Sequence, residues 1–380
     1  MVYLDNAATT LPKPRAVVDV MRRAVTEFAA NPGRGGHELS RRSGDALYCA
    51  RQTAAEFFGA QIPENVIFTP GCTYSINYVL KGLLRPGDHV VISDLEHNAV
   101  VRPLHKLCQY GVSVTRAHVC EDDPELTLRC FSQAIRRTTR LVFCTHASNV
   151  TGVRLPIEEI AAMCASRGIP MGVDGAQSAG VLPLALDGQA VDYICVPGHK
   201  GLYGAAGTGA LIMRDSSPFG TVIEGGTGSA SSLRDQPEDY PDRLESGTVN
   251  LPGILAMKAG IEFVTGKGRE NIARHEYALA QMAYDGLQKI KGVTLYTRRP
   301  TPDGHVPLIP FNVGDLASED AGRMLSERGI AVRAGYHCAY DAHVCIGTAG
   351  RGAVRVCPSA FSHPSDIDAL LRAVRQISIN

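Results

Sequence analysis

The chain has 380 residues, 44% of them apolar, and its 38 basic residues balance its 38 acidic residues. This composition is sufficient for a large core, and the zero formal charge gives no overall field to attract nucleic acid or an anionic membrane. No apolar run approaches the roughly 18 residues that a membrane-spanning helix needs. We therefore expect neither nucleic acid nor a membrane among its partners.

The N-terminal stretch MVYLDNAATTLPKP lacks the basic and apolar regions of a secretory signal. The 11 cysteines are odd in number and form no C-x-x-C pair. An odd and unpatterned set of cysteines argues against a disulfide framework and indicates a reducing compartment. The sequence thus predicts a cytoplasmic protein.

Short, β-branched apolar runs alternate with helical patterns through the first two-thirds of the chain. Such runs suit strands that are buried on both faces. Their alternation with helices predicts a mostly parallel sheet covered by helices on both sides. We expect strands at residues 65–70, 88–94, 140–146, 169–174 and 191–196, and helices at residues 73–84 and 155–168.

After about residue 265 the regular alternation of strands and helices gives way to long helical stretches with isolated strands. This change predicts a smaller α+β domain with a boundary near residue 260. Its expected helices cover residues 269–290 and 318–328, and its expected strands cover residues 292–297 and 305–313. Residues 363–377 have the pattern of a closing amphipathic helix, for which Ser365 or Asp366 is a candidate cap.

Ligands of open α/β sheets bind beyond the carboxyl ends of the strands, and three candidate features follow predicted strands here. Gly71-Cys72-Thr73 opens a helix and suits an anion, although, taken alone, an ordinary helix cap is the better explanation. Asp174 ends an apolar strand and is either a ligand for a cationic group or a helix cap. Lys200 lies in a glycine-rich turn and is either a Schiff-base amine or a solvated lysine.

Together, these three features match what pyridoxal 5'-phosphate requires from a protein. Its phosphate needs a helix N-terminus, its pyridine nitrogen needs a carboxylate, and its aldehyde needs a lysine. The sequence therefore predicts this cofactor.

At this point a family resemblance becomes apparent. The chain resembles pyridoxal-phosphate enzymes of fold type I in the class V aminotransferase branch, and within it the cysteine desulfurases and selenocysteine lyases. The motifs that carry the resemblance span nearly the whole chain: YLDNAATT, NPGRGGHELS, LEHNA, HASNVTG, VDGAQSAG, PGHKGLYG, ESGTVN and GYHC. The resemblance implies a large domain with a mostly parallel seven-stranded sheet at residues 15–260. Residues 1–14 and 261–380 would form a small domain with the catalytic cysteine.

The resemblance also implies roles for the residues in these motifs. Lys200 would bond to the cofactor aldehyde, Asp174 would pair with the pyridine nitrogen and Gln177 would contact the phenolic oxygen. His97 would stack on the ring and, as a catalytic residue beside Lys200 and Cys338, shuttle protons. The remaining implied cofactor contacts are Thr73, Cys72, Asn149 and His199, with Gly226 and Thr248 supplied by the second subunit of a homodimer. Cys72 is a departure, because relatives often carry a hydroxyl or small residue there.

The substrate carboxylate would be bound by Arg355 with help from Asn149, because a guanidinium matches a carboxylate in a bidentate manner. Arg333 and Arg34 match family arginines near the mouth of the site.

The GYHC motif places Cys338 at the family's nucleophile position. The reaction needs a thiolate, and we expect His337 and Arg333 to favour the ionised form. The sequence after Cys338, AYDAHVCIGTAGRG, departs from the family's usual HCAPL run. A zinc site would need His343 and Cys345 as further ligands, but the spacing matches no zinc pattern, so we expect no metal and a structural or tuning role for both.

The implied activity is that of a cysteine desulfurase, a transferase that converts L-cysteine to L-alanine and passes the sulfur, as a persulfide on Cys338, to a protein or thiol acceptor. The alternatives are an L-selenocysteine lyase or another C–S lyase, a transaminase, and a non-catalytic sulfur carrier.

Overall fold

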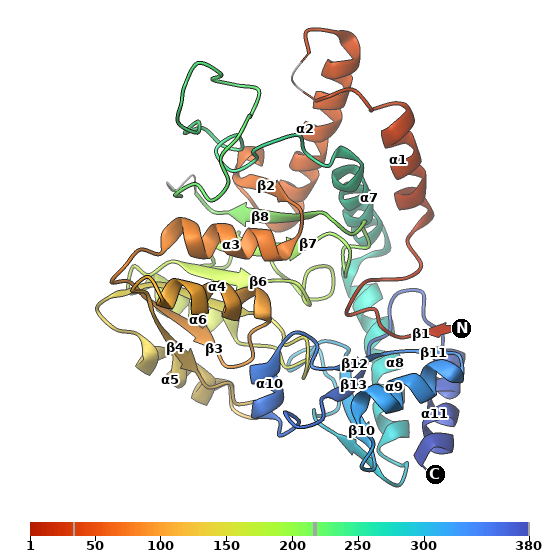
Figure 1. The fold of residues 1–380 in the computed structure, drawn as a ribbon. Coiled ribbons are helices and arrows are strands. Elements are labelled where there is room, and N and C mark those ends of the chain that lie inside the picture. The colour runs from red at the N-terminus through yellow and green to blue at the C-terminus, as the bar shows by residue number, and fades with distance from the viewer. Residues whose placement is uncertain (33–34, 216–218, 379–380) are drawn as a thin grey trace.

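A seven-stranded sheet forms the centre of the larger part of the molecule (Figure 1). The structure is a computed structural model and describes residues 1–32, 35–215 and 219–378. The strand order is β2-β8-β7-β6-β5-β3-β4. Within this sheet, β8 alone runs in the direction opposite to all the other strands. The predicted α/β class with a mostly parallel seven-stranded sheet is confirmed. The strands are β2 (Val66–Thr69), β3 (His89–Ser93), β4 (Ser113–Ala117), β5 (Thr139–Thr145), β6 (Met171–Asp174), β7 (Tyr193–Pro197) and β8 (Gly209–Met213).

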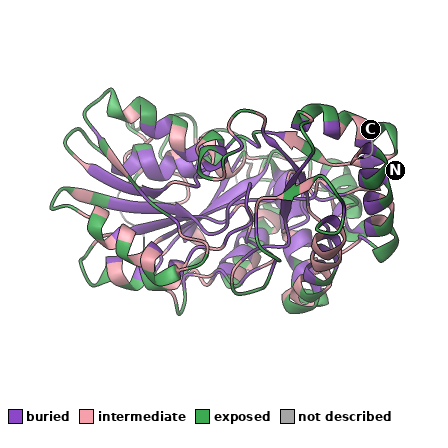
Figure 2. Ribbon diagram, turned by 90° about the horizontal axis from the view of Figure 1, so that it is seen from below, coloured by how far each residue is buried: buried purple, intermediate pink, exposed green. Residues whose placement is uncertain are grey.

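Helices cover both faces of this sheet, and neighbouring residues of its central strands pack on opposite sides. In β3, Val90 and Ile92 belong to the core layer beneath α3 and α4, whereas Val91 belongs to the layer beneath α2, α6 and α7. Every residue of β2, β3, β6, β7 and β8 is buried, as Figure 2 shows in purple. The helices are α1 (Arg15–Thr26), α2 (Glu38–Phe58), α3 (Cys72–Leu83), α4 (Asn98–Cys108), α5 (Pro124–Ala134), α6 (Ile157–Ala165) and α7 (Leu251–Lys267), with a 3-10 turn η1 (Pro63–Asn65) before β2.

The C-terminal part contains a separate four-stranded antiparallel sheet with the order β12-β13-β10-β9. Near the N-terminus, β1 (Val2–Tyr3) pairs with β11 (Ile330–Ala331), so the first residues lie among the C-terminal elements (Figure 1). The remaining elements are α8 (Arg269–Leu287), β9 (Val293–Leu295), β10 (Ile309–Val313), α9 (Ser318–Glu327), β12 (Arg333–Gly335), α10 (Tyr340–Cys345), β13 (Ala353–Val356) and α11 (Pro364–Ser378).

Two local features differ from the sequence-based expectations. The edge strand β4 was not predicted, because its residues are largely exposed and show no continuous apolar run. The expected cap of the last helix is wrong in position. The helix already begins at Pro364, and Asp366 Oδ2 instead accepts the backbone N–H of His363 at 2.8 Å, as in a capping box. In the described part of the chain, no helix is long and apolar enough to cross a membrane.

Candidate active site

A cavity of about 360 Å³ lies where β6 and β7 end and where α3 and α4 begin. This is the edge of an α/β sheet at which ligands bind. The cavity brings together most of the predicted cofactor contacts, although they come from distant parts of the sequence. Those that line it are Cys72, Thr73, His97, Asn149, Asp174, Gln177, His199 and Lys200.

Asp174 is the last residue of β6, and its side chain is almost completely buried. Its Oδ1 accepts the backbone N–H of Ala176 at 2.9 Å and the thiol of Cys72 at 3.4 Å. Its Oδ2 accepts no hydrogen bond from the described residues. A carboxylate oxygen without a partner, on a side chain that lines a cavity, suits a cationic N–H group of a ligand.

Lys200 lies in the turn that follows β7. Burial lowers the pKa of its amine, and the nearby Asp174 carboxylate opposes this effect in part. A lysine with a lowered pKa loses its proton more readily and becomes nucleophilic. The turn itself is fixed by the N-terminal segment, because the His199 carbonyl accepts hydrogen bonds from the Thr10 backbone N–H at 3.1 Å and from Lys13 Nζ at 2.8 Å.

The start of α3 forms the opposite wall of the cavity. Gly71 is the N-cap residue and provides no side-chain cap, so the first N–H groups of the helix are available to an anion. His199 Nδ1 is buried and has no hydrogen-bond partner in the described part of the chain. Burial lowers the pKa of His199 to about 4, so its ring is a neutral donor or acceptor near pH 7. With Thr73 on the same wall, this region has the donors that a phosphate group requires.

His97 and Gln177 are held by contacts to nearby backbone. His97 is the N-cap of α4, and its Nδ1 accepts the backbone N–H of Ala99 at 3.0 Å. Burial lowers the pKa of His97, so the neutral ring carries its proton on Nε2. Gln177 Nε2 donates to the carbonyl of Ala7 at 3.1 Å.

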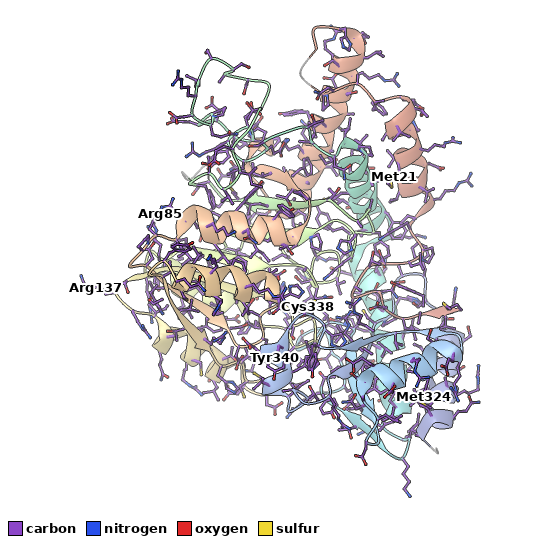
Figure 3. All side chains as sticks on the ribbon, in the orientation of Figure 1. Met21, Arg85, Arg137, Met324, Cys338 and Tyr340 are labelled. Atoms are coloured by element: carbon purple, nitrogen blue, oxygen red, sulfur yellow. The ribbon has the colours of Figure 1, made fainter. Side chains whose placement is uncertain are left out.

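Cys338 lies in the exposed loop between β12 and α10. Its carbonyl accepts the backbone N–H of Asn98, the first residue of α4, at 2.7 Å. The preceding carbonyl, of His337, accepts Asn149 Nδ2 at 2.7 Å. The loop is therefore attached directly beside His97 at the cavity, and Figure 3 shows Cys338 near the middle of the molecule.

The expectation that His337 favours the thiolate of Cys338 by its charge is wrong. The His337 side chain is buried, and this burial lowers the pKa of its imidazole to about 2. The ring is neutral near pH 7 and supplies no positive charge. Arg333 is exposed on β12 and keeps its charge.

Arg355 is buried on β13, close to the cavity but not in its lining. Its Nη1 donates to the Asn149 carbonyl at 2.8 Å, and its Nη2 forms an ion pair with Asp5 Oδ1 at 3.2 Å. Its Nε has no partner among the described residues. Arg333 is directly opposite Arg355 in the β12–β13 pair. Like charges opposite each other are destabilising, which favours an anion between or beside them.

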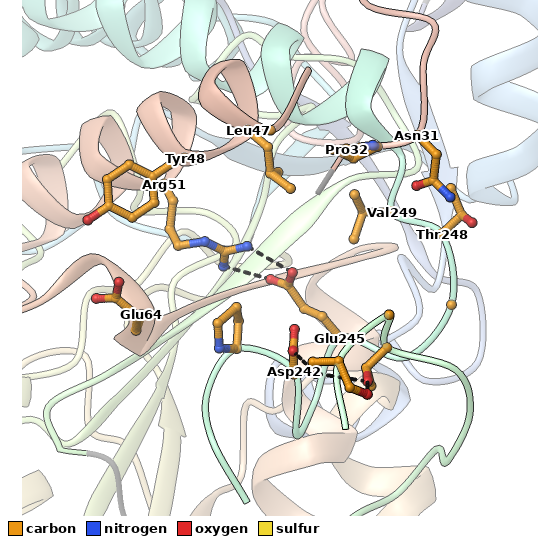
Figure 4. Close-up of a pocket in the computed structure, with 16 residues that line it drawn as sticks. Asn31, Pro32, Leu47, Tyr48, Arg51, Glu64, Asp242, Glu245, Thr248 and Val249 are labelled. Atoms are coloured by element: carbon orange, nitrogen blue, oxygen red, sulfur yellow. Dashed lines mark hydrogen bonds and ion pairs between the residues drawn. The ribbon is translucent and has the colours of Figure 1, made fainter. Parts of the chain in front are cut away.

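The residues predicted to contact a second subunit lie elsewhere. Thr248 lines another cavity, of about 300 Å³, which also contains the ion pair of Arg51 and Glu245 (Figure 4). The Gly226 carbonyl accepts the backbone N–H of Gly247 at 2.9 Å, and Gly226 does not line the cavity of Lys200. Arg34 lies outside the described residues.

Two residues near the site were missed by the sequence reasoning. Glu96 is buried and accepts the backbone N–H of Thr145 at 2.9 Å as well as the hydroxyl of Ser93, so it fixes the segment before His97. Burial raises its pKa to about 8. Asp5 is the partner of Arg355. Both were visible as acidic residues within the LEHNA and YLDNAATT motifs, but nothing in the sequence named their partners.

Comparisons with known proteins support the same interpretation. The family model of the class-V aminotransferases matches residues 2–370. A probable cysteine desulfurase of Mycolicibacterium paratuberculosis is 32% identical over all of this chain, which spans 55% of that relative. A cysteine desulfurase of Haloferax volcanii is 32% identical over 98% of this chain and 88% of its own length.

A solved structure is similar over the whole chain. The apo structure of a cysteine desulfurase from Thermococcus onnurineus NA1 has a TM-score of 0.90 and 29% sequence identity, and the match covers 100% of this chain and 94% of that one. The family expectation from the motifs is thus confirmed. The chain belongs to the class-V aminotransferase family and, within that family, to the cysteine desulfurases.

Proposed function

We propose that the protein is a pyridoxal-phosphate-dependent cysteine desulfurase that converts L-cysteine to L-alanine and retains the sulfur as a persulfide on Cys338. The observation that carries this proposal is the attachment of the Cys338 loop to the start of α4, beside a cavity that contains Asp174 and Lys200. A nucleophilic sulfur and a lysine amine at one cavity are the two groups that the reaction needs.

The donor set of the cavity fits the cofactor. The start of α3, Thr73 and His199 would hold the phosphate, Asp174 would hold the pyridine nitrogen, and Lys200 would bond to the aldehyde. Two atoms support the fit, because neither has a hydrogen-bond partner within the described residues. They are Oδ2 of Asp174 and the buried Nδ1 of His199. When bound, the cofactor supplies an electron sink for bond cleavage at the substrate Cα.

In this proposal the chain's own residues carry out three tasks. Lys200 removes the Cα proton, for which its lowered pKa suits it. The Cys338 thiolate attacks the substrate sulfur, so an S–S bond forms while the substrate C–S bond breaks. His97, which lines the same cavity, would relay the proton that completes L-alanine, taking up one proton as it gives up another. One L-cysteine and one enzyme thiol thus give one L-alanine and one enzyme persulfide.

The terminal sulfur of the persulfide then passes to a thiol of a small molecule or protein, which restores the Cys338 thiol. We further propose that Arg355 binds the substrate carboxylate, with Asn149 and the exposed Arg333 assisting. The support is the pair of opposed arginines on β12 and β13, which an anion would stabilise.

We also propose a cytoplasmic homodimer in which Gly226 and Thr248 complete the phosphate site of the partner. None of the 11 cysteines is in a disulfide, which supports a reducing compartment. The division into residues 15–260 and a second domain of residues 1–14 and 261–380 belongs to the same proposal. It is supported by the pairing of β1 with β11.

The test is turnover of L-cysteine by the holoenzyme with an added reductant, with alanine and sulfide quantified together. We expect equal amounts of both, and we expect Cys338→Ala to form neither. Pyruvate with sulfide, or no product from cofactor-loaded enzyme, would overturn the assignment. Loss of L-cysteine turnover in Cys338→Ala with retained L-selenocysteine cleavage would show that Cys338 is needed only for the poorer leaving group.

A further inference from the structure

The loop that carries Cys338 has an unfavourable backbone conformation. His337 and Cys338 are consecutive and both have positive φ angles, of 51° and 57°. Residues with a Cβ atom rarely adopt this left-handed conformation, because the side chain crowds the backbone. Two such residues in succession persist only when surrounding contacts hold them.

Two hydrogen bonds hold the carbonyl groups of His337 and Cys338, but they do not hold the two side chains. Asn149 Nδ2 binds the His337 carbonyl and the Asn98 N–H binds the Cys338 carbonyl, each at 2.7 Å. These two hydrogen bonds fix only the carbonyl groups. The strained φ angles can therefore still relax unless a side chain of the loop is held in place as well. The side chain of His337 is the one that enters the protein, because Cys338 is exposed.

His337 is fixed by two residues that follow Cys338 in sequence. Its Nδ1 lies 3.2 Å from His343 Nε2, and the two rings are nearly parallel, with an interplanar angle of 13° and centroids 5.4 Å apart. His343 Nδ1 in turn lies 2.7 Å from Thr348 Oγ1. We call His337, His343 and Thr348 the histidine clasp.

The histidine clasp is closed to solvent and uncharged. His343 and Thr348 are at most 1% exposed, and His337 is 6% exposed. Burial lowers the pKa of His343 to about 4 and that of His337 to about 2, so each ring carries one proton and can share a hydrogen bond with the next. The Tyr336 ring packs edge-on against His343 at 5.5 Å between centroids and covers it.

His343 has no place in the reaction itself, because it lies behind the loop and does not line the cavity. We propose that His343 is a positioning residue, which holds His337, and through it the strained backbone of Cys338, so that the thiol is presented to the substrate. The proposal rests on the proposed function for the identity of the reaction, but the immobilisation of the loop does not depend on it.

The first test is amide hydrogen exchange of the holoenzyme, because it reports the loop without any turnover. We compare His343→Ala with Thr348→Val, which preserves the shape of the threonine and removes only its hydroxyl. His105→Ala serves as the matched control, since His105 is an exposed histidine on α4. We expect exchange to accelerate by about tenfold or more at the Asn98 amide and across residues 336–348 in both clasp variants, with the rest of the chain unchanged.

The second test separates positioning from substrate binding. For His343→Ala we expect kcat for L-cysteine to fall by about tenfold or more and KM to change by less than about twofold, because binding groups are untouched. Thr348→Val should show a smaller loss of kcat of about threefold. His343→Gln, whose amide can still bridge the two neighbours, should restore part of the loss.

The outcomes are distinguishable. Unchanged exchange at Asn98 and in residues 336–348 would overturn the proposal. Acceleration throughout the chain would also overturn it, since His343 would then contribute only to general stability. If exchange accelerates locally but the wild-type holoenzyme forms no alanine from L-cysteine, the clasp is upheld and the proposed desulfurase function is not.

Discussion

The cavity that contains Asp174 and Lys200 and the loop that carries Cys338 are two neighbouring regions that are built in different ways. Asp174 is the last residue of β6, and Lys200 lies in the turn that follows the adjacent strand β7. The loop is held by contacts from three separate segments, through Asn98, Asn149 and His343. The sheet places Asp174 and the start of the turn that carries Lys200, whereas the Cys338 loop depends on a few individual contacts.

This difference implies that the two regions respond differently to substitution. A group placed on a strand end keeps its position when a neighbour is changed, because the sheet is rigid. A strained loop moves when one of its few contacts is removed. Asn149 connects the regions, since it lines the cavity, donates to the His337 carbonyl and accepts from Arg355.

The largest expected effect concerns the cavity. Lys200→Ala should reduce L-cysteine turnover by at least about 10³-fold, because both the covalent attachment of the cofactor and the general base are lost. The measurement is the rate of alanine formation by enzyme reconstituted with excess cofactor. Because Lys200 lies in the turn after β7 and outside the Cys338 loop, the exchange of residues 336–348 should stay at the wild-type rate.

Lys291→Ala, which changes an exposed lysine, is the matched control and should turn over normally. Turnover within about tenfold of wild type in Lys200→Ala would contradict the role of Lys200 as cofactor attachment site and general base. The reaction would then not take place in this cavity.

The next effect concerns the junction of the two regions. Arg355→Gln should raise KM for L-cysteine by about 10²-fold, because hydrogen bonds to charged groups contribute about 1.5–3 kcal/mol each. The substitution also leaves the Asp5 carboxylate without its ion-pair partner. The double variant Asp5→Asn/Arg355→Gln therefore shows how much of the change comes from the unpaired carboxylate.

Arg328→Gln, at an exposed arginine that follows α9, is the control for Arg355→Gln. A change in kcat with an unchanged KM would instead show that Arg355 acts on the loop through Asn149 and does not bind the substrate carboxylate.

Much of the fold was predictable from local sequence. The runs that became β3, β6 and β7 are mostly apolar because they are buried on both faces, and the helices between them have clear periodicity. The edge strand β4 was not predictable in this way, since half of it faces solvent. The pairing of β1 with β11 joins the two ends of the chain, and no local pattern encodes such a contact.

The residues of the candidate site also divide into those that local sequence predicts and those that it does not. Asp174 and Lys200 could be found because functional groups follow strand ends, and Cys338 was found only through its motif. The histidine clasp could not be predicted, because the contact between the His337 and His343 rings depends on the turn that α10 makes. The same burial reversed the expectation about the charge of His337, since sequence proximity gives no measure of desolvation.

A moderate effect is expected for the free energy of unfolding at acidic pH, through the titration of His343. The folded pKa of His343, about 4, lies below the unfolded value of about 6.5. Between these values the unfolded chain binds a proton that the folded chain does not, so the stability that His343 contributes is complete above pH 6.5 and is lost as the pH falls towards 4. At pH 5 the loss amounts to about 2 kcal/mol for this group.

Urea unfolding of wild type and His343→Gln at pH 7 and pH 5 checks this expectation, because contributions of other groups cancel in the difference. The stability advantage of wild type should shrink by about 2 kcal/mol at pH 5. An advantage that is the same at both pH values would show that His343 titrates normally in the folded protein.

The smallest effect is expected inside the cavity, at the residue that departs from the family pattern. The Cys72 thiol donates to Asp174 Oδ1 at 3.4 Å, and burial raises the pKa of this thiol, so it keeps its proton and its donor role. Thiols are weak donors, and the Ala176 N–H still binds the same oxygen in Cys72→Ala. We therefore expect kcat to fall by no more than about threefold.

Cys72→Ala leaves Asp174 Oδ1 with one hydrogen bond fewer, so the pH at which the absorption of the bound cofactor changes should shift by no more than a fraction of a unit. Cys72→Ser, which preserves a donor, should stay close to wild type. A shift above about one unit, equivalent to about 1.4 kcal/mol, would mean that Cys72 determines the electrostatics of Asp174. The cavity would then depend on single side chains as strongly as the Cys338 loop does, and the contrast between the two regions would not hold.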